Sequence, residues 1–243
     1  MRGTTELIDA LAASLEALAD DAEVTVALTR LCQEACQVLP ADGAAVCLVD
    51  EEGRMRTVAA SDETIHRIEV LQQVLGEGPC NRTIAEDAPV LVDDLAQGPD
   101  RWPGFASATQ LAGMRAVTCL PVRGTSGLVG ALCLFRRDPA RFSVDDLALG
   151  QLFARLAGAY VVVDRRRART QEVVEQLQYA LTSRVAIEQA KGMLAVRFAI
   201  SVDDAFDLIR KHARTTNQKA DAVARLVLDG HLLDKDPLGR LHA

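Results

Sequence analysis

The chain has 243 residues, of which 49% are hydrophobic and 25% are charged. This is the composition of a globular protein, and it excludes a wholly disordered, collagen-like or low-complexity chain. The formal net charge of −7 argues against nucleic-acid binding. That charge is divided unevenly, however, because residues 1–163 carry a net charge of −10 and residues 164–243 a net charge of +3. The division favours two modules with different partners.

The start of the chain and its cysteine content indicate a compartment. The first residues lead into an amphipathic stretch with acids, unlike the apolar core of a signal peptide. No run approaches the roughly 20 apolar residues that a membrane-spanning helix needs. Six cysteines are too sparse for a disulfide scaffold. We therefore expect a cytoplasmic protein with reduced thiols and no membrane contact.

Helical and strand patterns are mixed in the first part of the chain. Apolar spacing predicts helices over 5–18, 22–39 and 65–75, with Asp20 and Asp21 as a break between the first two. Two apolar segments around an acidic, Gly-containing turn predict a β-hairpin over 43–60. Further strands are expected over 88–92, 116–122 and 128–135, and loops over 76–80 and 98–104. This order predicts an α+β domain with at least five strands.

From Ser143 onward the pattern is helical. Ser143 and Asp146 fit a capping box at the start of a long helix, and its apolar residues recur at spacings of three and four. We expect the stripe over 147–163 to pack on the domain's own sheet. We expect the stripe over 168–180 to form a coiled-coil seam between two copies of the chain.

A bundle of three helices is predicted to follow. The long helix continues over 177–198, and a second helix begins at the capping box of Ser201 and Asp204. A third helix is expected from about 218 to Gly230, capped by Thr216 or Asn217. The predicted domains are a sensor over 1–163, a helical linker over 164–176, a bundle over 177–232 and a tail over 233–243.

One run in this bundle is distinctive. Residues 180–194 read Ala-Leu-Thr-Ser-Arg-Val-Ala-Ile-Glu-Gln-Ala-Lys-Gly-Met-Leu, and the pattern continues over 203–213 and 221–224. In order and spacing it resembles the ANTAR family of bacterial antiterminators. The resemblance implies a three-helix module that binds paired hairpins in nascent mRNA and prevents a terminator from forming. Ala195 and Ala220 depart from the family, which usually has Met and Leu there.

The candidate RNA-binding residues are the cations of this run and their small neighbours. Spacing places Arg184 and Lys191 on one helix face and Arg210 and Arg214 on another. Cations neutralise phosphate and give salt-dependent affinity, whereas RNA sequence is usually read in unpaired loops. Small side chains beside Lys191 would allow a phosphate or flipped base to approach. The full set is Arg184, Ala190, Lys191, Gly192, Arg210, Arg214 and Lys219.

Other interpretations of the bundle remain open. Phe206 shares a face with Ile209 and is expected in the core, so base stacking on aromatic rings is not the leading mechanism. A net charge of +3 is small, and a charged run is usually a solvated face. The corresponding alternative is a dimerisation or sensor protein that does not bind RNA.

Short motifs in the first module resemble the GAF family. They include Gly-Glu-Gly-Pro-Cys over 76–80, Asp-Asp-Leu over 93–95, Trp-Pro-Gly-Phe over 102–105 and the apolar run over 128–135. The resemblance implies a central antiparallel sheet with flanking helices, a pocket for a small ligand and dimerisation through flanking helices. The ligand and any cofactor are unknown, because the cyclic-nucleotide signature and a bilin-attachment context are absent. A haem is disfavoured, since His66 is the only His before residue 212.

Cysteines raise an enzymatic alternative. Cys80 is expected in a Gly/Pro loop near Arg82, where a thiolate would be exposed and activated. One enzyme subgroup of the GAF fold reduces free methionine sulfoxide with cysteines near a similar loop, so a thiol-based redox enzyme is the alternative function. The favoured interpretation is nevertheless that the cysteines are packing residues, with Cys47, Cys119 and Cys133 in apolar predicted strands. No compact cluster of metal ligands is evident in the sequence, so no metal site is expected.

The sequence thus predicts a cytoplasmic regulator that is not an enzyme and has no catalytic residues. An α+β GAF-like domain, with a central antiparallel sheet and flanking helices, would be joined by a long helix to an all-α ANTAR-like bundle. The expected partners are hairpins in nascent mRNA, a small-molecule ligand and a second copy of the chain.

Overall fold

The computed structural model describes residues 8–10, 12–14, 16, 18, 23–50, 52–97 and 101–231. The chain divides into two compact units, residues 1–167 and 168–243. The described residues of the predicted helix over 5–18 are helical. The rest of that helix, the break at Asp20 and Asp21, and the predicted tail over 233–243 lie outside the described residues.

The first unit is built on a five-stranded antiparallel sheet with strand order β2-β1-β5-β4-β3. Gly53, with φ of 77°, lies in the turn that closes the predicted hairpin. The predicted strands are confirmed, with small shifts at their ends. Their bounds are Gly43–Val49 (β1), Met55–Ala60 (β2), Val90–Val92 (β3), Ala116–Gly124 (β4) and Gly127–Arg136 (β5).

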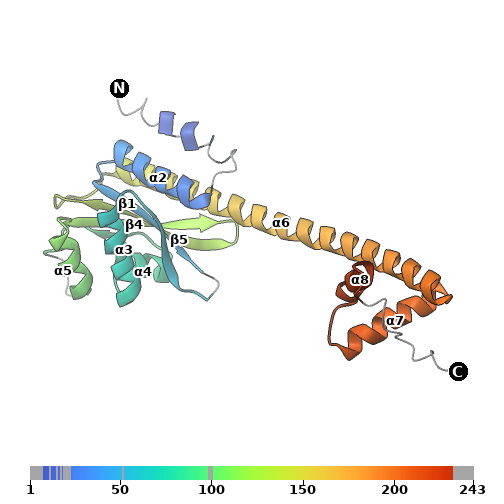
Figure 1. The fold of residues 1–243 in the computed structure, drawn as a ribbon. Helices are drawn as coiled ribbons and strands as arrows, with labels where there is room; N and C mark the ends of the chain where they lie inside the picture. The colour runs from blue at the N-terminus through green and yellow to red at the C-terminus, as the bar shows by residue number, and fades with distance from the viewer. Residues whose placement is uncertain are drawn as a thin grey trace. The chain divides into compact units, whose positions relative to one another are not determined.

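Helices cover both faces of the sheet (Figure 1). Alternate strand residues point to opposite faces, so Ala44 and Val46 of β1 pack with one helical layer and Ala45 and Cys47 with the other. The first layer contains α2 (Val24–Val38) and the first part of α6 (Val144–Phe198). The second layer contains α3 (Glu63–Leu75), α4 (Pro79–Glu86) and α5 (Pro103–Leu111).

Two predicted loops are partly helical. The loop predicted over 76–80 ends at Pro79, the first residue of α4, and the loop predicted over 98–104 ends at Pro103, the first residue of α5. Proline is favoured at the first helical position, because its missing N–H has no helical partner there and its φ is already helical. The Gly/Pro clusters were therefore helix starts as well as turns.

Helix α6 begins as predicted, with reciprocal hydrogen bonds between Ser143 and Asp146. Phe153, Ala154 and Ala157 are buried against the sheet, which confirms the packing expected for 147–163. Residues 164–182 are exposed. An 18-residue window of α6 reaches a mean hydropathy of 1.3, enough to cross a membrane by length and composition alone. One such helix is weak evidence for a span, because the core helices of soluble proteins pass the same test.

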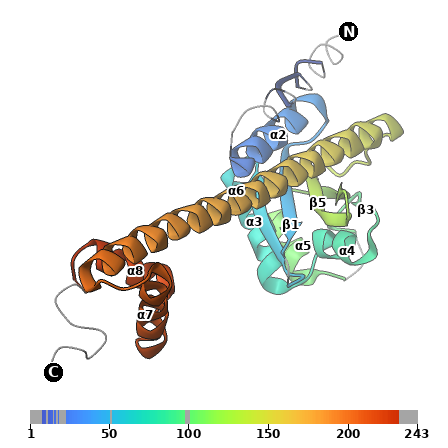
Figure 2. The ribbon, with the colours of Figure 1, turned by 90° about the vertical axis from the view of Figure 1, so that its right-hand side faces the viewer.

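Within its described residues, the second unit contains the expected helices (Figure 2). The end of α6 packs with α7 (Val202–Thr215) and α8 (Ala220–Leu228). The core is rich in alanine, which allows close helix packing, and consists of Ala186, Ala190, Leu194, Ala205, Ile209, Ala213, Val223, Ala224 and Val227. Ser201 caps α7 as predicted. Helix α8 begins later than predicted, because Lys219 rather than Thr216 or Asn217 is its N-cap residue.

Candidate functional site

Two cations of the bundle flank one aromatic ring. Lys191 Nζ lies 5.3 Å and Arg210 Cζ lies 5.4 Å from the centre of the Phe206 ring. Phe206 is half-buried, so its expected place in the core is wrong. Ala205 and Ile209 fill the core instead, and Phe206 lies at the edge of that face of α7. We call Lys191, Phe206 and Arg210 the cation–ring patch.

Arg184 and Lys191 differ in their surroundings, although both belong to α6. Lys191 Nζ donates to both carboxylate oxygens of Glu188 at 2.9 Å, and only 14% of the Lys191 side chain is exposed. Arg184 is exposed and has no hydrogen-bond or ion-pair partner within the described parts of the chain. Arg184 is therefore the more available cation, whereas neighbouring groups hold Lys191 in place.

The two small residues beside Lys191 have different environments. Ala190 is entirely buried in the bundle core, so it packs helices together and does not offer a surface to RNA. Gly192 is exposed, and a Cβ atom added there would meet nothing within 4 Å. The sequence predicts that a phosphate or base could approach the helix at both residues, but only Gly192 leaves the surface open for this.

The remaining candidate cations, Arg214 and Lys219, have different surroundings. Arg214 is exposed in the last turn of α7, one helical turn beyond Arg210. Lys219 Nζ lies 5.3 Å from the centre of the Tyr179 ring, whose hydroxyl donates to Asp221 at 2.7 Å. The structure therefore brings Lys191 and Arg210 together and gives Lys219 a different aromatic neighbour.

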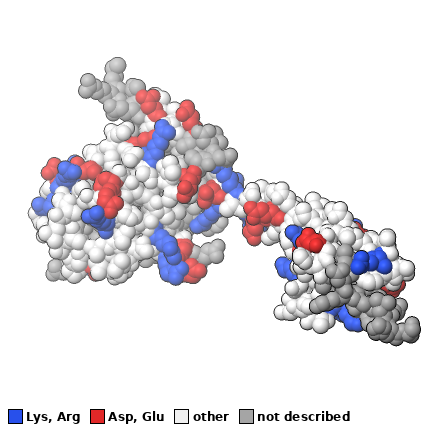
Figure 3. Space-filling view, viewed as in Figure 1, with Lys and Arg blue, Asp and Glu red and all other residues white. Residues whose placement is uncertain are grey.

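The visible surface of each unit carries both signs of charge (Figure 3). Lys and Arg are interspersed with Asp and Glu there, so the net charge of a unit does not correspond to a single-sign face in this view. Ala195 and Ala220, the departures from the family pattern, both border the bundle core as partly buried residues. Their small size therefore affects packing.

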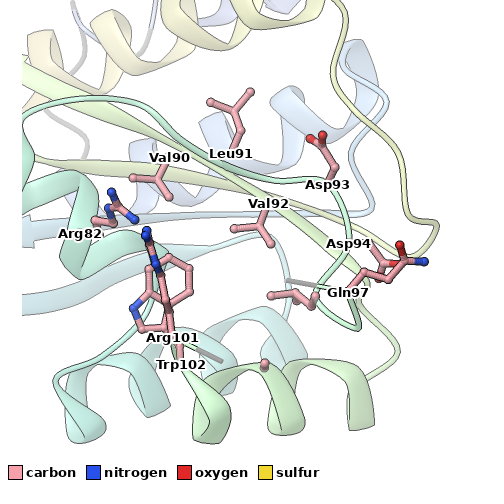
Figure 4. A pocket seen from close by; sticks show the side chains of 11 residues that line it. Arg82, Val90, Leu91, Val92, Asp93, Asp94, Gln97, Arg101 and Trp102 are labelled. Carbon is pink, nitrogen blue, oxygen red and sulfur yellow. The ribbon is translucent and has the colours of Figure 1, made fainter. Parts of the chain in front are cut away.

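The first unit contains a cavity of about 350 Å³ between β3, the segment after it, α4 and α5. Its volume lies in the range of small-molecule sites. Arg82, Arg101 and Trp102 lie at one end, and Asp93, Asp94 and Gln97 at the other (Figure 4). The resemblance to the GAF family implies a pocket for a small ligand, but the sequence did not show which residues line it. Its signals were the single Trp of the chain and the paired aspartates.

The acids of this cavity already have partners. Asp94 accepts two hydrogen bonds from one nitrogen of Arg115, both at 2.9 Å, and Asp93 accepts from Arg141 at 3.0 Å. The N–H of Ala96 and the Arg115 guanidinium lower the pKa of Asp94. Both aspartates are thus already engaged by arginine side chains.

Cys80 is not in an exposed loop. It lies in the first turn of α4 and is entirely buried, and a hydrogen bond with Cys133 and burial raise the pKa of its thiol well above the ordinary value. Cys80 is therefore a buried packing residue, and the exposed, activated thiolate that the enzymatic alternative required is not found there. Burial also raises the pKa of Glu69 to about 7, against the effect of its hydrogen bond with Cys47.

The expected absence of a compact ligand cluster is wrong as well. Cys47, Glu69 and Cys80 are far apart in sequence, but each offers a ligand atom within 4.8 Å of the other two. Strand β1 and helices α3 and α4 bring them together, so no sequence spacing revealed the group.

Family models agree with this architecture. The GAF domain model matches residues 21–162, and the ANTAR domain model matches residues 175–228. The fold and the bundle therefore define a regulatory protein with a sensor domain and an ANTAR domain. The chain belongs to the GAF domain family, and an ANTAR domain follows its GAF domain. No curated protein matches the chain.

Solved structures resemble the first unit. A free methionine-R-sulfoxide reductase from Neisseria meningitidis is 15% identical, with a TM-score of 0.52 over 69% of this chain and 94% of that one. The GAF domain of a phosphoenolpyruvate-protein phosphotransferase from Coxiella burnetii is 18% identical, with a TM-score of 0.51 over 69% and 98%. At these identities the likeness shows the fold alone.

Proposed function

We propose that this protein is a signal-responsive, RNA-binding regulator of transcription antitermination. Its ANTAR domain binds hairpins in nascent mRNA, and its GAF domain controls that binding. The observation that supports this most is the matched ANTAR domain, in which Lys191 of the cation–ring patch directly precedes the exposed Gly192 and follows the exposed Arg184 on the same helix. Because the target is nascent mRNA, the protein acts in the cytoplasm.

Different side chains contact the phosphates and the bases of the RNA. Arg184, Arg210 and Arg214 are exposed and neutralise phosphates, which gives affinity that falls with salt. Lys191 braces Phe206 and adds charge, while the exposed part of the ring contacts an unpaired loop base. The open surface at Gly192 lets the RNA backbone approach α6.

The other parts of the chain regulate this site. The GAF domain takes a small molecule in the cavity beside Arg101 and Trp102, and the ligand shifts the population of a binding-competent arrangement. Residues 168–180 pair two copies of the chain, so two bundles engage paired hairpins at high effective concentration. The protein is not an enzyme on this proposal, and the burial of Cys80 supports that view.

Binding to hairpin RNA across a salt series tests the proposal. The full-length chain is expected to bind paired hairpins, with affinity that falls as salt rises. Arg184→Gln and Lys191→Gln should each weaken binding by about tenfold, the scale of one lost charged contact. Arg165→Gln and Arg166→Gln, in the linker, are the matched controls and should have smaller effects.

Two outcomes would count against the site. Equal losses for all four variants would indicate nonspecific attraction to a charged surface. No binding by the full-length chain, with or without cell-extract metabolites, would contradict RNA binding and favour a dimeric sensor without that activity.

A further inference from the structure

Three potential metal ligands lie close together in the GAF domain, on the face of the sheet that α3, α4 and α5 cover. Cys47 lies on β1, Glu69 on α3 and Cys80 in the first turn of α4. Their two Sγ atoms and a carboxylate oxygen lie within 4.8 Å of one another, and all three residues are buried. Within the described ranges, no other trio of His, Cys, Asp and Glu side chains is this compact.

Glu69 supplies the second observation. Its side chain is entirely buried, and its Oε2 accepts from Gln72 at 2.9 Å and from Cys47 at 3.2 Å. Its Oε1 is buried and has no hydrogen-bond partner. No Lys, Arg or His among the described residues forms an ion pair with it. A buried polar atom without a partner is costly, and an ion between Glu69 and the two thiols gives Oε1 that partner.

We propose that Cys47, Glu69 and Cys80 bind a zinc ion. Zinc takes Cys sulfur at about 2.3 Å and carboxylate oxygen at about 2.0–2.2 Å in tetrahedral geometry, which suits ligand atoms already this close. Cys133 lies outside this compact group, but its thiol interacts with Cys80 and with Glu69, so a small rotation of its side chain makes it the fourth ligand. The coordinating thiols lose their protons to solvent on binding, because the thiolate is the form that binds metal.

The proposed zinc site is structural and not catalytic. It has four protein ligands and no open position, as in closed zinc sites. The ion joins α3 and α4 to the sheet, and α4 also lines the cavity through Arg82. Because the ligands are shielded from solvent, the ion is taken up as the domain folds.

A disulfide is the competing interpretation of these thiols. Cys119 and Cys133 are cross-strand partners on β4 and β5, and their Sγ atoms lie 2.9 Å apart. A disulfide there would consume Cys133 but would leave Glu69 Oε1 without a partner. The zinc site accounts for the carboxylate as well as the thiols.

Elemental analysis of the full-length chain, purified untagged under reducing conditions, tests the site. We expect one zinc per chain, and at least about a tenfold loss of bound zinc in Cys47→Ala and in Glu69→Gln, since each removes a ligand. Cys36→Ala is the matched control, because Cys36 is on α2 and packs on the other face of the sheet. It should retain the wild-type zinc content.

Cobalt substitution and thiol counting keep the test valid if a variant folds poorly. Wild-type protein refolded with Co²⁺ should show the charge-transfer absorption of thiolate-bound cobalt, and Glu69→Gln should lose or shift it. All six thiols should alkylate in denaturant without reductant. The proposal would be overturned by protein without zinc, or by protein that holds iron or copper in its place. It would also be overturned by undiminished zinc in both variants, or by only four reactive thiols.

Discussion

At the scale of single residues, the bundle separates cations that brace the structure from cations that are available to a partner. Lys191 is mostly covered, because it bonds Glu188 and lies over Phe206. Arg184 is exposed without a protein partner in the described part of the chain. The sequence motif gave both residues as candidate RNA-binding cations. Their spacing shows that they share a helix face, but it does not show that Lys191 is already paired with Glu188.

Gly192→Ala should separate stability from RNA binding. A helical glycine in open space costs about 0.5–1 kcal/mol relative to alanine, so the variant should be slightly more stable by thermal unfolding. If RNA backbone approaches this surface, the added methyl group should weaken hairpin binding several-fold. Binding equal to that of the unmodified chain would remove Gly192 from the interface.

At the scale of elements, local signals predicted most of the fold. Alternating apolar residues predicted the strands, and the boxes at Ser143 and Ser201 predicted two helix starts, because both signals depend on near neighbours in sequence. The starts of α4 and α5 were missed, because Gly and Pro mark turns as well as first helical turns. The cluster of Cys47, Glu69 and Cys80 was missed because it depends on the packing of three separate elements.

Gly158→Ala tests the contact between α6 and the sheet. A Cβ at Gly158 would overlap the backbone carbonyl of Arg123 on β4, which cannot move as a side chain does. We expect a loss of about 1–3 kcal/mol in the free energy of unfolding. Trp102, the only tryptophan, reports urea unfolding of this unit by its fluorescence.

The matched control for that variant is Arg155→Ala, an exposed position on the same helix. It should change the free energy of unfolding by no more than about 0.5 kcal/mol. A Gly158→Ala protein as stable as the control would show that α6 does not approach β4 as closely as described.

At the scale of the whole molecule, the exposed stretch of α6 is the proposed place of dimerisation. Val173 and Leu177 follow the seam spacing, and they are 48% and 60% exposed in the single chain. Apolar residues at this spacing fit a coiled-coil partner. A dimer would present two ANTAR domains to two hairpins.

Leu177→Glu should dissociate that dimer, because it places a charge in the apolar seam. Gln178→Glu adds the same charge one residue away, off the seam, and should leave the dimer intact. Sedimentation equilibrium measures the oligomeric state of both variants. Only Leu177→Glu should also lose affinity for paired hairpins, by about 10²-fold or more, because a monomer loses avidity. A monomeric wild-type chain, or equal behaviour of the two variants, would refute the seam.

The most direct measurement of the proposed function is terminator readthrough in a purified transcription reaction. The template would carry paired hairpins ahead of an overlapping terminator, and its control would carry the same terminator with the hairpin loops replaced. We expect the full-length protein, with its activating signal if it needs one, to raise readthrough on the first template alone. Arg184→Gln should reduce that rise. Hairpin binding without any change in readthrough would contradict antitermination as the function of this protein.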